Sequence, residues 1–415
     1  MNSRERVFAS INHREPDRIP IDLGATAVTG ISAIAYHNLK KHLGITTGHT
    51  RIYDLIQQLA QVEDNIVDLY NVDVLDVGRT FNTSDEDWYD VHVNGIDAQF
   101  PNWFQPRHNP DDSYDVLHRD GTVLGSMSKN ALVLDQSYYP SLEDYPSDYP
   151  EFQRMLSKIL GAALLIPPFS NIGQRRFWKT LRANAIKLKE ETNKTIVINS
   201  GGSIFELGSY FRRLDKFLID LIKYPSKVEK FLDMLMEFQL TTLKVIFSYI
   251  GDVVDIIRIG DDLGENKGPL ISPRIYRKII KPYHIELCDF IKKHSSMKIF
   301  FHSCGSITPI IPDLIEAGID ILNPVQLSAN NMDPKHLKEN FGDDLTFWGG
   351  GVDTRYVFNR KSPEEVKQHV KELLKIFAPG GGFVWSAVHN ILPDVPPQNI
   401  VAAFEAIEEF NSEYF

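Results

Sequence analysis

The chain is poor in cysteine, with only Cys288 and Cys304 among its 415 residues. Two cysteines in a chain of this length do not form a disulfide framework, which excludes the small secreted domains that depend on cross-links. Residues 1–6 are polar and charged and contain no apolar signal core. We therefore expect a protein of the reducing cytoplasm.

Long hydrophobic runs and an excess of positive charge are also missing. The most apolar stretch, residues 159–169, is too short to span a bilayer and is interrupted by two consecutive prolines. The net charge is −11, from 55 acidic and 44 basic residues. Nucleic acids and anionic membrane surfaces attract concentrated positive charge, so we expect neither as the main partner.

Two cofactor-binding patterns are absent or incomplete. No G-x-G-x-x-G follows an expected strand, which weakens the case for a dinucleotide-binding sheet. Residues 90–95 match D-x-H-x-x-G, the pattern that places a histidine under cobalt in corrinoid-binding domains. Neither the helix nor the Gly-Gly that this pattern requires follows it, so we interpret residues 90–95 as a surface turn.

What the sequence does contain is a regular alternation of short apolar runs, rich in β-branched residues, with longer amphipathic segments. The expected strands are residues 19–22, 72–77, 195–200, 255–260, 297–302, 319–323, 345–348 and 382–386. The expected helices are residues 204–223, 273–293, 307–317, 362–377 and 397–410. Repeated strand–helix units predict a parallel sheet, and strands that are apolar throughout are buried on both faces. We predict an α/β fold, a (β/α)₈ TIM-type barrel, with an open doubly wound sheet as the alternative.

The first half of the chain interrupts this alternation. Between residues 85 and 149, Asp, Pro, Tyr and Trp crowd together, with turn sequences at Asn94-Gly95 and Asp120-Gly121. We expect an inserted β-meander with loops that covers the barrel mouth. No low-complexity tract or linker separates parts of the chain, so residues 1–415 are predicted to form one barrel domain.

Polar residues follow four of the expected strands, where barrel active sites gather. They are Asp261-Asp262, His302 to Gly305, Asn323 to Gln326 and His389-Asn390. His302 and Cys304, two positions apart and just before a glycine, offer an imidazole and a thiolate, both good zinc ligands. Since two ligands do not hold zinc, we predict His389 as the third, with the fourth position open. A buried thiol beside a hydrogen-bonded histidine is the alternative.

The remaining candidates have weaker support. Asp261 and Asp262 are predicted as a catalytic acid, base or further metal ligand, although capping of the following loop explains aspartates there equally well. Asp22, Asn323 and Gln326 are predicted to bind a polar substrate.

Several segments together resemble the uroporphyrinogen decarboxylase-like superfamily, whose members are barrels. These are RERV at 4–7, HREPDRIP at 13–20, GDDLG at 260–264, GPLISP at 268–273, HSCG at 302–305, VHNI at 388–391 and PDVPP at 393–397. True decarboxylases of this group carry an arginine-rich segment of the type R-P-V-W-x-M-R-Q-A-G-R that grips a polycarboxylate. Residues 19–27 read IPIDLGATA and contain no arginine, so the resemblance does not favour porphyrinogen decarboxylation.

The resemblance instead favours the cobalamin-dependent methyltransferase branch. Related methyltransferases bind zinc through H-x-C and a distant cysteine on the last strand; here His302 and Cys304 are kept, and His389 stands where the distant cysteine is expected. The implied function is zinc-dependent methyl transfer between a small methoxy compound or thiol and a separate corrinoid protein that carries the cobalamin. A metal-independent decarboxylase of a small organic acid is the alternative.

Overall fold

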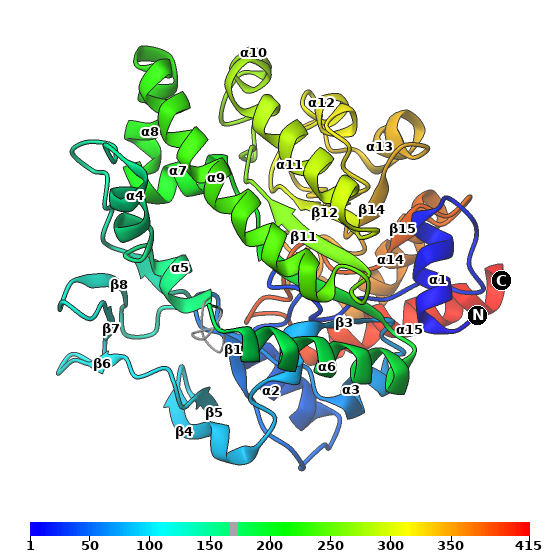
Figure 1. Ribbon diagram of the computed structural model, residues 1–415. Coiled ribbons are helices and arrows are strands. Elements are labelled where there is room, and N and C mark those ends of the chain that lie inside the picture. Colours follow the sequence, from blue (N-terminus) through cyan, green and yellow to red (C-terminus); the bar gives the residue numbers. More distant parts are fainter. Residues whose placement is uncertain (166–172) are drawn as a thin grey trace.

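The core of the protein is a curled sheet of seven parallel strands in the order β15-β14-β13-β12-β11-β10-β3 (Figure 1). The computed structural model describes residues 1–165 and 173–415; the end of the apolar stretch 159–169 lies outside them. The strands are β3 (Val74–Asp76), β10 (Thr195–Gly201), β11 (Ile256–Gly260), β12 (Lys298–His302), β13 (Ile321–Asn323), β14 (Thr346–Trp348) and β15 (Phe383–Val384). Each coincides with a run expected as a strand.

An eighth extended segment closes the sheet into a barrel. On one side, the backbone N–H of Trp385 donates to the carbonyl of Pro20, and that of Asp22 donates to the carbonyl of Trp385. On the other side, the N–H of Asp73 donates to the carbonyl of Ile21. The predicted first strand is therefore an isolated bridge rather than a regular strand, but it joins β15 to β3 and confirms the TIM-type barrel.

Helices surround the outer face of the sheet (Figure 1). They include α1 (Ser3–Ile11), α2 (Ala33–His42), α3 (Asp64–Leu69), α6 (Arg175–Thr192), α9 (Pro225–Ile250), α11 (Lys281–His294), α12 (Ile311–Glu316), α13 (Pro334–Phe341), α14 (Pro363–Phe377) and α15 (Pro397–Tyr414). The start of α14 confirms the expected cap: Ser362 accepts from the N–H of Glu365, whose carboxylate accepts from the N–H of Ser362.

Two predicted helices are interrupted. Residues 204–223 form α7 (Phe205–Arg212) and α8 (Leu214–Lys223), because Arg213 between them adopts φ +67° and cannot continue a right-handed helix. Residues 273–294 comprise α10 (Pro273–Ile275), a π-helical turn (Tyr276–Ile280) and α11. The amphipathic pattern survives such breaks, which is why it does not locate them.

The inserted region is antiparallel β-structure, as expected. A hairpin of β4 (Trp88–Val93) and β5 (Ile96–Pro101) turns at Asn94-Gly95, so the D-x-H-x-x-G match is a hairpin turn. A second sheet contains β6 (Arg107–His108), β7 (Tyr114–Leu117), β8 (Val123–Met127) and β9 (Asp135–Gln136), followed by α4 (Tyr149–Leu156) and α5 (Leu160–Leu165). The region has its own hydrophobic core and packs on β1 (Ile52–Asp54), which pairs with β2 (Leu59–Ala60).

Side chains of alternate strand residues face the barrel interior in layers. One layer is an apolar cluster containing Val74, Val197, Ile256, Phe300, Ile321, Trp348 and Val384. Two residues further along five of these strands, the inward positions are polar. They hold Asp76, Asn199, Arg258, His302 and Asn323. The inward-facing positions therefore change from apolar to polar within two residues, at the carboxyl ends of the strands.

In the part of the chain that the structure describes, no helix combines the length and apolar character required to cross a membrane.

Candidate metal centre at the barrel mouth

His302 and Cys304 lie at the carboxyl end of β12. His302 is the last strand residue and is buried, and Cys304 follows in a turn that ends at Gly305. Gly305 adopts φ +87°, and a Cβ there would lie 2.4 Å from the backbone carbon of Gly264. Only glycine fits this close approach, so the turn that aims Cys304 back toward His302 depends on it.

His389 reaches the same place from the loop after β15. It adopts φ +62°, a left-handed conformation that is uncommon for a residue with a Cβ. Its neighbours hold it there: Thr354 Oγ1 donates to the carbonyl of Val388, and Asn390 Oδ1 accepts from the N–H of Gly30. Backbone strain of this kind persists where the surroundings over-determine it, often at functional sites.

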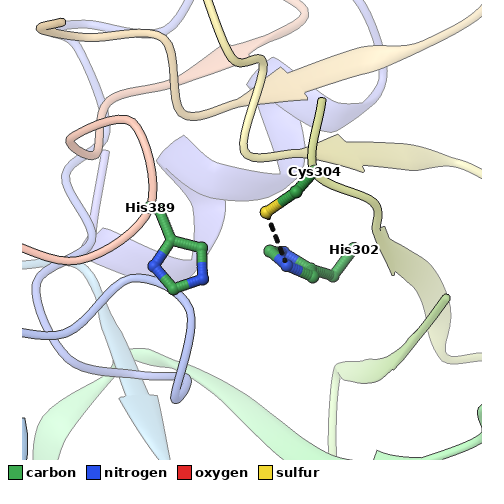
Figure 2. A group of neighbouring side chains, drawn as sticks. All are labelled: His302, Cys304 and His389. Carbon is green, nitrogen blue, oxygen red and sulfur yellow. Dashed lines mark hydrogen bonds between the residues drawn. The ribbon is translucent and has the colours of Figure 1, made fainter. Parts of the chain in front are cut away.

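The three side chains converge on one point (Figure 2). A ligand atom from each of His302, Cys304 and His389 lies within 4.8 Å of the other two. Cys304 Sγ is 3.4 Å from His302 Nε2, close to the separation of about 3.5 Å that zinc–ligand distances imply for two ligands of one tetrahedral zinc. The geometry suits zinc with one position left open, and occupancy stays a prediction.

Two further side chains orient this cluster. His302 Nδ1 donates to Asn323 Oδ1 (2.6 Å), which turns Nε2 toward Cys304. Asn323 is itself held because its Nδ2 donates to the carbonyl of Trp348. Asp262 Oδ1 accepts from the N–H of Cys304 (2.8 Å) and lies 3.5 Å from His302 Nε2. Hydrogen bonds of this kind fix the tautomer and direction of metal-binding histidines.

The protonation states also suit metal binding. Burial, helped by the positive charge of Arg258, lowers the pKa of His302 to about 3. Burial, with the charges of His302 and Arg258, lowers the pKa of His389 to about 3. Both imidazoles are therefore neutral, as a ligand must be. Burial and the nearby Asp262 carboxylate raise the pKa of the Cys304 thiol well above its usual value, so the thiol keeps its proton until a bound cation displaces it.

Asp261 has different surroundings from Asp262. It is fully buried and accepts from the backbone N–H groups of Ile204 and Glu206 and from His284 Nε2, at 2.7–3.0 Å. His284 Nδ1 in turn accepts from the Tyr276 hydroxyl at 2.9 Å. These contacts tie the loop after β11 to α7, the π-helical turn and α11. They favour a structural role for Asp261, and its catalytic role stays a prediction.

The predicted substrate-binding residues also use their polar atoms within the protein. Asp22 accepts from the N–H of Ala25 and from Trp348 Nε1, and burial raises the pKa of its carboxyl to about 6. Gln326 accepts from the N–H of Gly305 and donates to Asn266. Asn323 orients His302, as described above. A direct contact of any of them with a substrate stays a prediction.

Three charged residues at the mouth were not predicted from the sequence: Asp76, Glu206 and Arg258. Burial raises the pKa of Asp76 to about 6, and burial together with the charges of Asp262 and Asp261 raises the pKa of Glu206. Asp76 and Arg258 lie in strands that are otherwise apolar, each two residues after a buried aliphatic residue. That interruption of an apolar run was the available signal. Glu206 lies in α7, where a helical glutamate attracts no notice.

Fold and site together define a closed α/β barrel with a candidate three-ligand metal centre at the carboxyl ends of its strands. The uroporphyrinogen decarboxylase (URO-D) family model matches residues 157–410, more than half of the chain. The chain belongs to the URO-D family. This confirms the superfamily resemblance that the sequence motifs indicated.

Curated relatives share modest identity with the chain. A uroporphyrinogen decarboxylase from Pseudoalteromonas translucida (strain TAC 125) is 26% identical over 151 residues, which cover 35% of this chain and 40% of that protein. One from Chloroherpeton thalassium is 23% identical over 312 residues, 72% of this chain and 82% of that protein. The solved structure of a methyltransferase from Methanosarcina mazei superposes with a TM-score of 0.59, covering 99% of both chains at 17% identity, which shows a shared fold.

Proposed function

We propose that the protein is a zinc-dependent methyltransferase that moves a methyl group between a small methoxy compound or thiol and a separate corrinoid protein. The observation that carries the proposal is the convergence of His302, Cys304 and His389 within 4.8 Å at the barrel mouth. Two neutral imidazoles and one thiol form a donor set for zinc with one position free for a substrate.

In this proposal the three side chains hold the metal and their neighbours keep them in place. When bound, zinc supplies Lewis acidity, which lowers the pKa of a substrate thiol or polarises the oxygen of a methoxy group. Asn323 keeps His302 Nε2 directed at the metal position. Asp262, whose side chain is 38% exposed, accepts from the Cys304 N–H and is better placed than Asp261 to hold or release a proton.

The corrinoid is expected on a partner protein because residues 90–95, the only match to the cobalt-histidine pattern found in the sequence, form a hairpin turn. The net charge of −11 and the inserted β-region beside the barrel are compatible with docking of a cofactor-carrying domain. The methyltransferase fold of the Methanosarcina mazei neighbour adds support. Cobalamin is thus the proposed source or acceptor of the methyl group.

A decarboxylase acting on a small organic acid is the second candidate. The URO-D family model and the decarboxylase relatives favour it, and Asp76, with its raised pKa, offers a carboxyl group at the mouth. Such an enzyme would not require the metal centre. The absence of arginine from residues 19–27 argues against a polycarboxylate substrate for it.

Metal analysis of the full-length protein, purified without chelator, separates the two candidates. Methyl transfer predicts about one zinc per chain, lost in Cys304→Ser and retained in Cys288→Ser. Cys288 is a matched control because it is buried in α11 away from the mouth. Methyl transfer from methylcobalamin to a thiol acceptor should follow zinc content across these variants. Metal-free protein that releases CO₂ from an organic acid at full rate contradicts the proposal.

A further inference from the structure

Arg258 is a cation in the interior of the barrel. It lies on β11, where its register partners are Asn199 on β10 and Phe300 on β12. Its inward neighbour two residues earlier is Ile256, part of the apolar layer, and its side chain is the next one toward the mouth. An arginine at this position belongs to the same polar inward layer as Asp76, Asn199, His302 and Asn323.

The guanidinium of Arg258 has no partner among the described residues. Its Nε is buried and without a hydrogen bond, and no ion pair involves this side chain within residues 1–165 and 173–415. The other arginines at comparable depth are paired: Arg6 binds Asp17 and Asp73, and Arg212 binds Asp220. Buried guanidinium groups are normally paired because desolvating an uncompensated charge is expensive.

The charge of Arg258 acts on the candidate metal centre and on the carboxyl groups around it. It contributes to the low pKa of His302 and His389, and it opposes the rise that burial causes in the pKa of Asp54. It also opposes the burial-driven rise for Glu206. Arg258 is therefore within electrostatic reach of the metal ligands while no protein carboxylate neutralises it at contact distance.

We propose that Arg258 binds the carboxylate of a small monoanionic substrate inside the barrel mouth, beside His302, Cys304 and His389. This assignment deepens the proposed function, on which it rests for the reacting end of the substrate. A carboxylate matches the two parallel N–H groups of a guanidinium. One guanidinium offers its paired N–H groups to one carboxylate, and the raised pKa values of Asp54 and Glu206 show that further negative charge nearby is unfavourable, so a monoanion fits better than a phosphate dianion or a polycarboxylate.

The Tyr53 hydroxyl is a second buried polar group without a partner among the described residues. Burial, followed by the charges of Asp54, Asp76 and Asp22, raises its pKa well above the usual value, so this donor is within electrostatic reach of two carboxyl groups of the mouth, Asp76 and Asp22. A hydroxyl that keeps its proton is suited to donate to a carboxylate oxygen.

Binding of three probes to the zinc-loaded, full-length protein tests the assignment without a corrinoid protein. The probes are methoxyacetate, its neutral amide methoxyacetamide and methyl phosphate, measured by titration calorimetry or saturation-transfer NMR. Methoxyacetate should bind at least tenfold more tightly than the other two. Arg258→Met should remove at least tenfold of that preference, Arg258→Lys should retain part of it, and the exposed-site control Arg154→Met should retain all of it.

Stability and zinc content separate a ligand-binding arginine from a structural one. Because Arg258 has no partner to lose, Arg258→Met should unfold at the same temperature as the wild type or higher and keep its zinc. Equal binding of all probes to the wild type, no binding of methoxyacetate, or unchanged binding in Arg258→Met overturns the assignment. Destabilised Arg258→Met also overturns it. Selective binding by a protein that transfers no methyl group removes the proposed function and leaves this assignment in place.

Discussion

Two adjacent aspartates contact two different histidines, and the two pairs are built in opposite ways. Asp261 and His284 are 0% and 1% exposed, and every hydrogen-bonding atom of the pair has a protein partner. Asp262 and His302 lie 3.5 Å apart at the mouth, and His302 Nε2 lies 3.4 Å from the Cys304 thiol, in the cluster that also contains His389. The Asp261–His284 pair uses all its hydrogen-bonding atoms within the protein, whereas the Asp262–His302 pair can still bind a ligand.

Burial and hydrogen bonding together distinguish polar residues that hold the fold from polar residues that can bind a ligand. A buried polar network in which all groups are satisfied fixes loops in place and gains nothing from a ligand. A buried group with unused bonding capacity calls for an explanation, and a bound ion or substrate is the usual one. The His302 pair and Arg258 belong to the second kind, although the sequence spacing of the two aspartates gives no hint of the difference.

The largest effect is expected from breaking the metal cluster itself. His302→Ala removes one of three candidate ligands, and we expect zinc to be lost and methyl transfer to fall at least about 1000-fold. The unfolding temperature should change little compared with the zinc-free wild type. His294→Ala, on the exposed end of α11, is the control. Full zinc content and turnover in His302→Ala would show that the cluster is not the metal site.

Substituting Asp261, in the fully hydrogen-bonded pair, should lower stability and leave zinc content unchanged. Asp261→Asn turns an amide N–H₂ toward the donors from Ile204, Glu206 and His284, so we expect a loss of about 2–4 kcal/mol in the free energy of unfolding. Zinc content per folded chain should stay unchanged. Asp262→Asn retains an acceptor for the Cys304 N–H and should cost less than about 1 kcal/mol. Equal stability of the two variants, measured by urea unfolding, would contradict the structural role of Asp261 relative to Asp262.

A smaller effect is expected when only the orientation of His302 is disturbed. Asn323→Ala removes the acceptor for His302 Nδ1 while all three candidate ligands remain. Zinc affinity, measured by competition with a chelator, should fall about 10–100-fold. Asn323→Asp keeps an acceptor for His302 Nδ1 but loses the hydrogen bond to the Trp348 carbonyl, so it should recover only part of the affinity. Unchanged affinity in Asn323→Ala would mean that the turn geometry alone fixes the ring.

The smallest effect concerns Asp76, a polar group of the inner layer outside the metal cluster. Because burial raises its folded-state pKa to about 6, above about 3.9 in the unfolded chain, the folded state holds the proton more tightly. The free energy of unfolding should therefore decrease as pH rises from about 4 to 6. Relative to Asp76→Asn, the free energy of unfolding of the wild type should fall by about 2 kcal/mol over this pH range. Parallel pH profiles of the two proteins would contradict the raised pKa.

Much of the fold was predictable because apolar patterning reports burial directly. Every parallel strand was located, and the closing segment at residues 19–22 was included. The helix breaks at Arg213 and at the π-helical turn were missed, since tertiary packing imposes them without changing the apolar period. Of the site, the convergence of His302, Cys304 and His389 was predicted, whereas Asp76, Glu206 and Arg258 were not.

By itself, the sequence determined which strand ends carry reactive side chains, because alternation along a buried strand and a following glycine are local properties. It also predicted a parallel α/β sheet covered on both faces, whereas the bonds of residues 20–22 to Trp385 and Asp73 decided that this sheet closes. Only the tertiary structure decided which polar groups are satisfied. That depends on partners distant in the chain, such as Ile204 for Asp261 and Trp348 for Asn323, and on the absence of a partner for Arg258 among the described residues.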